Sequence, residues 1–163
     1  MNKYYPEVAT VFLKPGELVV CEHETLVTTV LGSCISVTMF HPDSRIGAIC
    51  HALLPQEKEK GEAFRYVDTS ILNMLDRFAG YGISRARLEV KLFGGADMLI
   101  AGRNNSRSVT VGRKNIEVAL QVIESEQLRL VASDLGGTQG RKICFHTHTG
   151  EIFLKRLRKC TEP

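Results

Sequence analysis

The Gly32-Ser33-Cys34 segment lies between two apolar stretches, and its composition predicts a tight turn that leads into a strand. A cysteine in such a turn suits nucleophilic catalysis, because the glycine exposes the sulfur and leaves backbone N–H groups free to stabilise an oxyanion. His51 lies on the next predicted strand, and a strand–turn–strand path could bring its imidazole beside Cys34. A thiol paired with histidine forms a thiolate–imidazolium couple that is nucleophilic near neutral pH. Spacing alone also allows a second interpretation, in which Cys34 is a buried packing residue and His51 a hydrogen-bonded core residue.

A second group of reactive side chains occurs in the run Cys144-Phe-His146-Thr-His148. Alternation on a strand would place these three side chains on one face, and a His-x-His pair can hold zinc with a water at the open position. Such a centre would indicate a metallohydrolase. A strand separates residues i and i+4 by about 13 Å, however, so the three donors reach one ion only with difficulty. The alternative interpretation is a hairpin end that carries exposed histidines.

Two glycine-rich segments follow predicted strands, Gly94-Gly95-Ala96 and the run at 136–141. Neither has the Walker lysine pattern, and neither reads G-x-G-x-x-G ahead of a helix, so a phosphate-binding loop is not indicated. Turn glycines are the favoured interpretation. Tight loops at strand ends also line pockets, which keeps a place near a binding site open for both segments.

The composition limits the class of protein. The chain has 163 residues, of which 44% are hydrophobic and 24% charged, so we expect a single folded domain over residues 1–163. The formal net charge of +3, from 21 basic and 18 acidic residues, is too small to indicate nucleic-acid binding. Tryptophan is absent and aromatic residues make up 7%, so a platform for base stacking has little support.

Membrane insertion and secretion are also not indicated. The longest stretch without Lys, Arg, Asp or Glu, residues 25–42, contains too many Thr, Ser and Gly residues to cross a bilayer. The first residues lack the apolar core of a signal peptide. Five cysteines, an odd number with no C-x-x-C pair, are more typical of free thiols in a reducing cytoplasm than of a disulfide framework.

Hydrophobic periodicity predicts a mixture of strands and helices. Apolar positions at helical spacing predict two helices, at 67–79 and 113–126. Alternating or continuous apolar runs predict strands at 8–13, 17–21, 35–40, 45–54, 86–93, 128–133, 141–147 and 151–157. Many strands with a few helices in mixed order indicate an α+β domain in packed layers.

A series of short motifs, taken together, resembles one known family. In chain order they are Thr28-x-x-x-Gly32-Ser33-Cys34, His51-Ala-Leu-Leu-Pro55, Tyr66-Val-Asp68-Thr69, Gly94-Gly95-Ala96, Gly112-Arg-Lys-Asn115 and Asp134-Leu-Gly136-Gly137 through Arg141. This pattern resembles the CheD family of chemoreceptor glutamine deamidases over residues 8–157. The resemblance implies a cysteine-hydrolase fold in α/β/β/α layers, similar to the deamidase domain of cytotoxic necrotizing factor toxins.

The resemblance also implies an activity and its partners. Members of the family convert specific glutamine side chains on the cytoplasmic helical bundle of chemoreceptors to glutamate, with release of ammonia. Some members also bind the CheC phosphatase. No metal and no organic cofactor is expected. The alternative is a non-catalytic adaptor of the same fold that binds the chemoreceptor or a CheC-type phosphatase.

Carried over by position, the resemblance implies that Cys34 is the nucleophile, His51 the base and Thr28 the residue that orients the imidazole. The family commonly has glycine where this chain has Val30, and Thr29 stands beside Thr28, so the identity of the orienting hydroxyl stays open. The remaining motif residues are expected to bind substrate or to line its pocket: Gly32, Ser33, Tyr66, Asp68, Thr69, Gly94, Gly95, Asn115 and Arg141.

Overall fold

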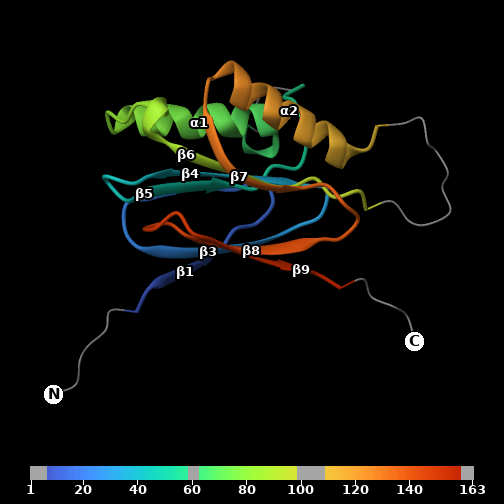
Figure 1. The fold of residues 1–163 in the computed structure, drawn as a ribbon, viewed down its shortest axis with the longest axis horizontal. Helices are drawn as coiled ribbons and strands as arrows, with labels where there is room; N and C mark the ends of the chain where they lie inside the picture. Colours follow the sequence, from blue (N-terminus) through green and yellow to red (C-terminus); the bar gives the residue numbers. More distant parts are fainter. Residues whose placement is uncertain (1–6, 59–62, 99–108, 159–163) are drawn as a thin grey trace.

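The structure is a computed structural model that describes residues 7–58, 63–98 and 109–158. These residues form nine β-strands and two α-helices in three layers. Both helices lie on one face of a five-stranded sheet, and a four-stranded sheet packs against its other face (Figure 1). No described helix combines the length and apolar character needed to cross a lipid bilayer.

The five-stranded sheet has the order β2-β5-β4-β6-β7. Its strands are β2 (Leu18–Cys21), β5 (Ile46–Cys50), β4 (Ile35–His41), β6 (Glu89–Gly94) and β7 (Arg129–Leu135). Every residue of β4 except the last is buried, because this central strand has the helices on one face and the second sheet on the other. The alternation of apolar and small polar residues along β4 matches these two environments.

The four-stranded sheet has the order β1-β3-β8-β9. It contains β1 (Ala9–Phe12), β3 (Thr25–Leu31), β8 (Arg141–His146) and β9 (Ile152–Arg156). The sequence analysis did not predict β3, because its threonines gave it no apolar run. Its side chains nevertheless alternate between buried and outward positions, with Thr25, Val27, Thr29 and Leu31 buried. The buried side chains of β3 therefore point toward the five-stranded sheet.

The two helices cover the five-stranded sheet in turn. Helix α1 (Val67–Gly80) lies over β2, β5 and β4, whereas α2 (Val111–Ser125) lies over β4, β6 and β7. Two short 3-10 helices, η1 (Ala63–Arg65) and η2 (Arg85–Arg87), flank α1. The Thr110 hydroxyl accepts a hydrogen bond from the Arg113 backbone N–H, which satisfies one of the free donors at the start of α2. Both predicted helices are therefore confirmed, with α2 beginning two residues earlier than expected.

Two apolar clusters join the layers. One lies between the helices and the five-stranded sheet and includes Val37, Met39 and Phe78. The other lies between the two sheets and includes Val27 and Phe145. Each layer covers its apolar face only by packing against the adjacent layer. No single layer is therefore a stable unit by itself.

The layer order differs from the expected α/β/β/α arrangement. The mixed α+β character is confirmed, but the described residues form α/β/β only. On the outer face of the four-stranded sheet, Phe12 and Phe153 are 57% and 61% exposed. Among the described elements, neither helix covers this sheet (Figure 1).

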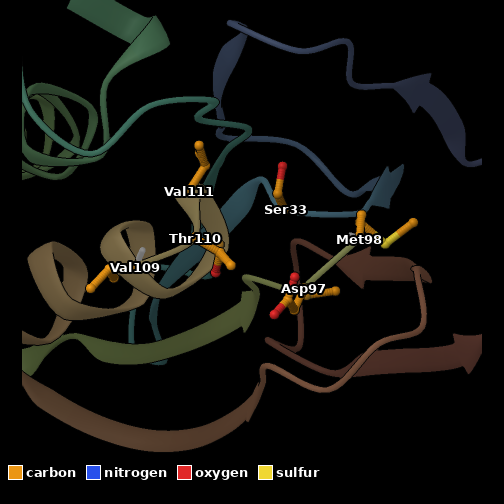
Figure 2. Close-up of a pocket in the computed structure, with 8 residues that line it drawn as sticks. Ser33, Asp97, Met98, Val109, Thr110 and Val111 are labelled. Carbon is orange, nitrogen blue, oxygen red and sulfur yellow. The ribbon is translucent and has the colours of Figure 1, made fainter. Parts of the chain in front are cut away.

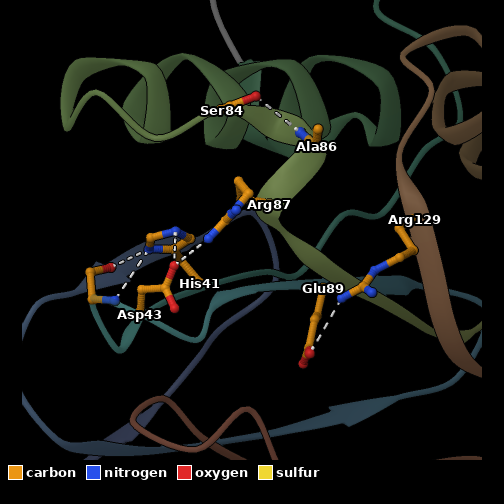
Figure 3. Close-up of polar contacts among 8 residues, drawn as sticks. His41, Asp43, Ser84, Ala86, Arg87, Glu89 and Arg129 are labelled. Atoms are coloured by element: carbon orange, nitrogen blue, oxygen red, sulfur yellow. Dashed lines mark hydrogen bonds and ion pairs between the residues drawn. The ribbon is translucent and has the colours of Figure 1, made fainter.

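Polar contacts hold the end of the five-stranded sheet at which β4 finishes and β6 begins (Figure 3). The Arg87 guanidinium donates to the Asp43 carboxylate at 2.7 Å, and the Arg129 guanidinium donates to Glu89 at 3.4 Å. In the β4–β5 turn, the Ser44 hydroxyl lies 2.7 Å from His41 Nδ1. These exposed contacts lie at the opposite end of β4 from Cys34.

Arg141 forms a buried polar contact at the start of β8. Its side chain is fully buried and donates to the Asp134 carboxylate and to the carbonyl oxygens of Asp134 and Gly136. The guanidinium thus holds the 134–136 segment against β8. Arg141 was expected to bind substrate or line its pocket, but complete burial gives it a structural position instead.

We predict that Arg141→Leu lowers the free energy of unfolding by about 3 kcal/mol, because it leaves two carbonyl groups and one oxygen of the Asp134 carboxylate without their donor, while Arg156 still donates to the other oxygen. Arg87→Leu is the matched control. Its ion pair with Asp43 is exposed on both sides, so the change should cost less than about 1 kcal/mol. Urea unfolding of both variants checks this, and equal losses would contradict the structural role of Arg141.

Candidate active site

Cys34 and His51 lie on neighbouring strand segments, and their side chains share one face. At the start of β4 and just past the end of β5, an isolated antiparallel bridge pairs Ile35 with Ala52 in the same register as the strands. That register places His51 opposite Ser36, on the face that Ser36 shares with Cys34. The thiol and the imidazole are therefore diagonal neighbours across the pair, about 7 Å apart at their Cβ atoms. This register supports the predicted pairing of Cys34 with His51, which stays a prediction.

The hydroxyl that holds the imidazole belongs to Thr29. Its Oγ1 lies 2.7 Å from His51 Nδ1, and both residues are almost fully buried between the two sheets. The expectation that Thr28 orients the ring is wrong in this structure, because successive residues of β3 point to opposite faces. Thr28 lies on the outer face of the sheet, where it pairs with Cys144 of β8. The alternation of Val27, Thr29 and Leu31 was the signal that could have identified Thr29.

The contacts of Thr29 determine the tautomer of His51. The Thr29 hydroxyl donates its single proton to the Leu13 carbonyl oxygen at 2.7 Å. It must then accept from the imidazole, so Nδ1 carries the ring proton and Nε2 carries a lone pair. Nε2 is buried and has no hydrogen-bond partner among the described residues. The imidazole is thus held at one nitrogen and left as an unprotonated base at the other.

Burial keeps both reactive groups neutral. It raises the pKa of the Cys34 thiol above its ordinary value of 9.0, although the backbone of Cys34 itself offsets part of the shift. Burial also lowers the pKa of His51 below 6.5, against the opposing effects of the Leu13 carbonyl and the Glu17 carboxylate. The thiolate–imidazolium couple expected from the sequence is therefore not the favoured resting state. A neutral thiol beside a neutral base is favoured instead.

The glycine segment after β6 packs against the backbone of the Cys34 turn. The Gly95 N–H donates to the Cys34 carbonyl oxygen, and the Ala96 N–H donates to the Gly32 carbonyl oxygen, both at 2.9 Å. Gly94 has a φ of +110°, and a Cβ atom there would lie 2.1 Å from the Cys34 carbonyl oxygen. Only glycine permits this approach. Gly94 and Gly95 act through the backbone of the turn.

A pocket of about 360 Å³ opens beside the turn (Figure 2). Ser33 borders it from the turn, Asp97 and Met98 from the segment after β6, and Thr110 and Val111 from the start of α2. The lining is mainly apolar, and Met98, Val109 and Val111 are each about half exposed. Besides Ser33, the family motifs include two residues that line this pocket, Ala96 and Gly112. The motifs do not include the remaining lining residues: Asp97, Met98, Val109, Thr110 and Val111.

Several known proteins are similar to this chain over most of its length. The model of a family described as CheD chemotactic sensory transduction matches residues 53–156. A relative from Geobacter sulfurreducens, named "Probable chemoreceptor glutamine deamidase CheD 2", is 52% identical over 159 residues, which cover 98% of this chain and 97% of the relative. The chain belongs to the CheD family. Relatives named "Probable chemoreceptor glutamine deamidase CheD" from Maridesulfovibrio salexigens and Thermococcus kodakarensis are 38% and 36% identical, over 98% and 87% of this chain and 98% and 89% of their own lengths.

The other CheD-family motif residues lie around the Cys34 turn, and some of them have structural contacts rather than a place in the pocket beside it. Tyr66 borders a second pocket, of about 470 Å³, which shares Val111 with the first. The Asp68 carboxylate accepts hydrogen bonds from the backbone N–H groups of Glu57 and Thr69, so it anchors the start of α1. Asn115 is fully buried behind the turn that carries Cys34.

The zinc hypothesis for Cys144, His146 and His148 is not supported by the geometry. Cys144 and His146 lie on the outer face of the four-stranded sheet, where the His146 ring packs edge-on against Phe153 with centroids 5.3 Å apart. Within residues 7–58, 63–98 and 109–158, no group of three or more His, Cys, Asp or Glu side chains is arranged to hold a metal ion.

We predict that Thr29→Val lowers kcat about 100-fold, because it removes the acceptor that fixes the imidazole while preserving the shape of the side chain. Thr28→Val is the matched control, and its kcat should stay within about twofold of the wild type because its side chain lies on the outer face. Ammonia release by the two variants measures the difference. A larger loss in Thr28→Val would restore the original assignment.

The pH dependence of the reaction should reflect the neutral base. Because burial lowers the pKa of His51 below 6.5, we predict that kcat/KM is constant between about pH 6.5 and pH 8. The rate should fall only below pH 6.5, where the imidazole takes up a proton and can no longer accept one from the thiol. An acid limb centred above pH 7 would contradict this picture.

Proposed function

We propose that this protein hydrolyses the side-chain amide of glutamine residues in chemoreceptors, which gives glutamate and ammonia. Membership of the CheD family supports the substrate, since the relatives are named for this activity. The observation that carries the chemistry is the His51 imidazole, which Thr29 holds at Nδ1 and which leaves Nε2 free on the face of Cys34. This arrangement suits acyl transfer through a cysteine.

In the first half of the reaction, His51 Nε2 takes the proton from the Cys34 thiol as the sulfur attacks the amide carbon. The carbonyl oxygen of the substrate becomes an oxyanion in a tetrahedral intermediate. His51 then gives its proton to the amide nitrogen, the C–N bond breaks, and ammonia leaves. A thioester between Cys34 and the glutamyl side chain remains.

In the second half, water attacks the thioester carbon. His51 Nε2 takes a proton from the water, the C–S bond breaks, and the proton returns to the sulfur. The products are a glutamate side chain and the original thiol, so no external co-reactant besides water is needed. The hydrogen bond from Thr29 to the Leu13 carbonyl keeps the imidazole in one tautomer through both halves.

The Cys34 backbone N–H is the oxyanion donor in this proposal, because the N–H of the nucleophile's own residue lies beside the carbonyl carbon that the nucleophile attacks. The apolar pocket beside Ser33 is the surface on which the polypeptide around the glutamine would rest. Together they favour a macromolecular amide over a small polar one.

Several finer points belong to this proposal. The substrate glutamines would lie on the cytoplasmic helical bundle of the chemoreceptor, and a CheC-type phosphatase would be a further partner. The protein would act in the cytoplasm as one domain, without metal or cofactor. The helix layer and the two sheets would correspond to part of the cysteine-hydrolase fold of the cytotoxic necrotizing factor deamidase domain.

The decisive variant is Cys34→Ala. Cys21 also lies on the face between the sheets, but it pairs with Gly47, about 13 Å along the strand from His51. Because Cys34 is the thiol placed diagonally to His51, we predict that ammonia release from a purified chemoreceptor fragment falls at least about 1,000-fold. Cys144→Ala, on the outer sheet face, is the control and should stay within about twofold. A Cys34→Ala protein that still deamidates would contradict the mechanism. Wild-type protein that binds the fragment but releases no ammonia would instead identify a non-catalytic adaptor.

A further inference from the structure

The strand segments that carry Cys34 and His51 separate just beyond their last shared pair. Ile35 and Ala52 exchange backbone hydrogen bonds at 2.9 Å and 2.8 Å. One step further, the Leu53 N–H donates to the Arg65 carbonyl oxygen, so the segment after His51 turns toward η1. The carbonyl groups of Ser33 and Leu53 are left on either side of this fork.

The side chain of Asn115 fills the fork. Its Nδ2 donates to the Ser33 carbonyl oxygen at 2.9 Å and to the Leu53 carbonyl oxygen at 3.0 Å. These two bonds use both N–H groups of the amide, and they connect α2 to the two segments that carry the reactive side chains. Few other side chains as short as asparagine carry two N–H donors on one nitrogen.

The buried amide is held at a cost. Asn115 is 0% exposed, and its Oδ1 is buried with no hydrogen-bond donor among the described residues. A buried polar atom without a partner is unfavourable for the folded state. The two donated bonds must therefore offset this loss, which indicates that the amide is needed where it lies.

The bond to Ser33 has a direct consequence for Cys34. The Ser33 carbonyl and the Cys34 N–H belong to the same planar peptide group and point in opposite directions. A donor that fixes the carbonyl therefore fixes the direction of the N–H on the other side of the plane. The backbone N–H of the nucleophile's own residue is the group that donates to the oxyanion in acyl transfer by an activated nucleophile.

We propose that Asn115 is a positioning residue that fixes the Ser33–Cys34 peptide plane and thereby aims the Cys34 N–H at the oxyanion. The role rests on the proposed deamidation, because attack of Cys34 on the glutamine amide develops this oxyanion. Asn115 itself makes no contact with the reacting atoms. It acts from behind the turn, through one peptide group, while its second bond ties that peptide to the segment following His51.

The test compares two reactions of Cys34 in Asn115→Asp and Asn115→Leu, both close in shape to asparagine. Amide hydrolysis needs the oxyanion donor, whereas alkylation of the thiol by iodoacetamide is a displacement at carbon that develops no oxyanion. We expect kcat for ammonia release to fall about 100-fold with KM within about threefold, while the rate of Cys34 alkylation stays within about threefold of the wild type.

The matched control is Asn73→Asp. Asn73 lies on α1, and its Nδ2 also donates to a backbone carbonyl oxygen, that of Thr69 at 2.9 Å, but it has no contact with the site. Both reactions should proceed in this variant at the wild-type rate. Circular dichroism and thermal unfolding establish that each variant is folded before rates are compared.

Three results would overturn the proposal: a wild-type kcat in a folded Asn115 variant, a parallel loss of hydrolysis and alkylation, or failure of both Asn115 variants to fold. The second would indicate a general distortion of the site, and the third a residue needed only for stability. The absence of ammonia release from the wild-type protein is a different result, since it contradicts the proposed function itself.

Discussion

A short chain of hydrogen bonds, from His51 Nδ1 through the Thr29 hydroxyl to the Leu13 carbonyl, is the contact on which the site depends. Each member comes from a different segment: His51 from the five-stranded sheet, Thr29 from β3 of the other sheet, and Leu13 from the connection after β1. These hydrogen bonds therefore form only when the two sheets are packed together. The imidazole is fixed in the same step in which the two sheets pack.

This dependence explains why small buried polar groups lie in an otherwise apolar interface. The cluster between the sheets contains Val27, Leu31 and Phe145, and Thr29 lies among them without exposure to solvent. An unpaired hydroxyl in that place would destabilise the fold. Because the hydroxyl both donates and accepts, it is satisfied while it holds the imidazole, so the requirement for a stable core and the requirement for a fixed tautomer are met by one side chain.

The sequence predicts that Cys34 and His51 lie near one another, because a glycine turn and two consecutive strands place both side chains on one face of the sheet. The residues that hold this pair in place are harder to predict. Thr28 was chosen by position in a motif, whereas the two-residue period of β3 selects Thr29, and that period was obscured by threonines that mask the apolar pattern. Asn115 was named as a pocket residue, but its actual contacts are two backbone carbonyls from distant segments, which no local pattern encodes.

The neutral state of the pair follows from the same burial that makes the site. Placing His51 between two sheets removes water from its ring, and Cys34 loses enough solvent for its pKa to rise. If Cys34 were a thiolate in the resting protein, the site would have to stabilise a negative charge at all times. In the proposed mechanism, a neutral thiol instead requires charge only while the substrate is bound, when the thiol proton moves to His51 Nε2 and the oxyanion forms beside the Cys34 N–H. The positive charge of the imidazolium and the negative charge of the oxyanion then form at the same time, close enough to stabilise one another in a poorly solvated pocket.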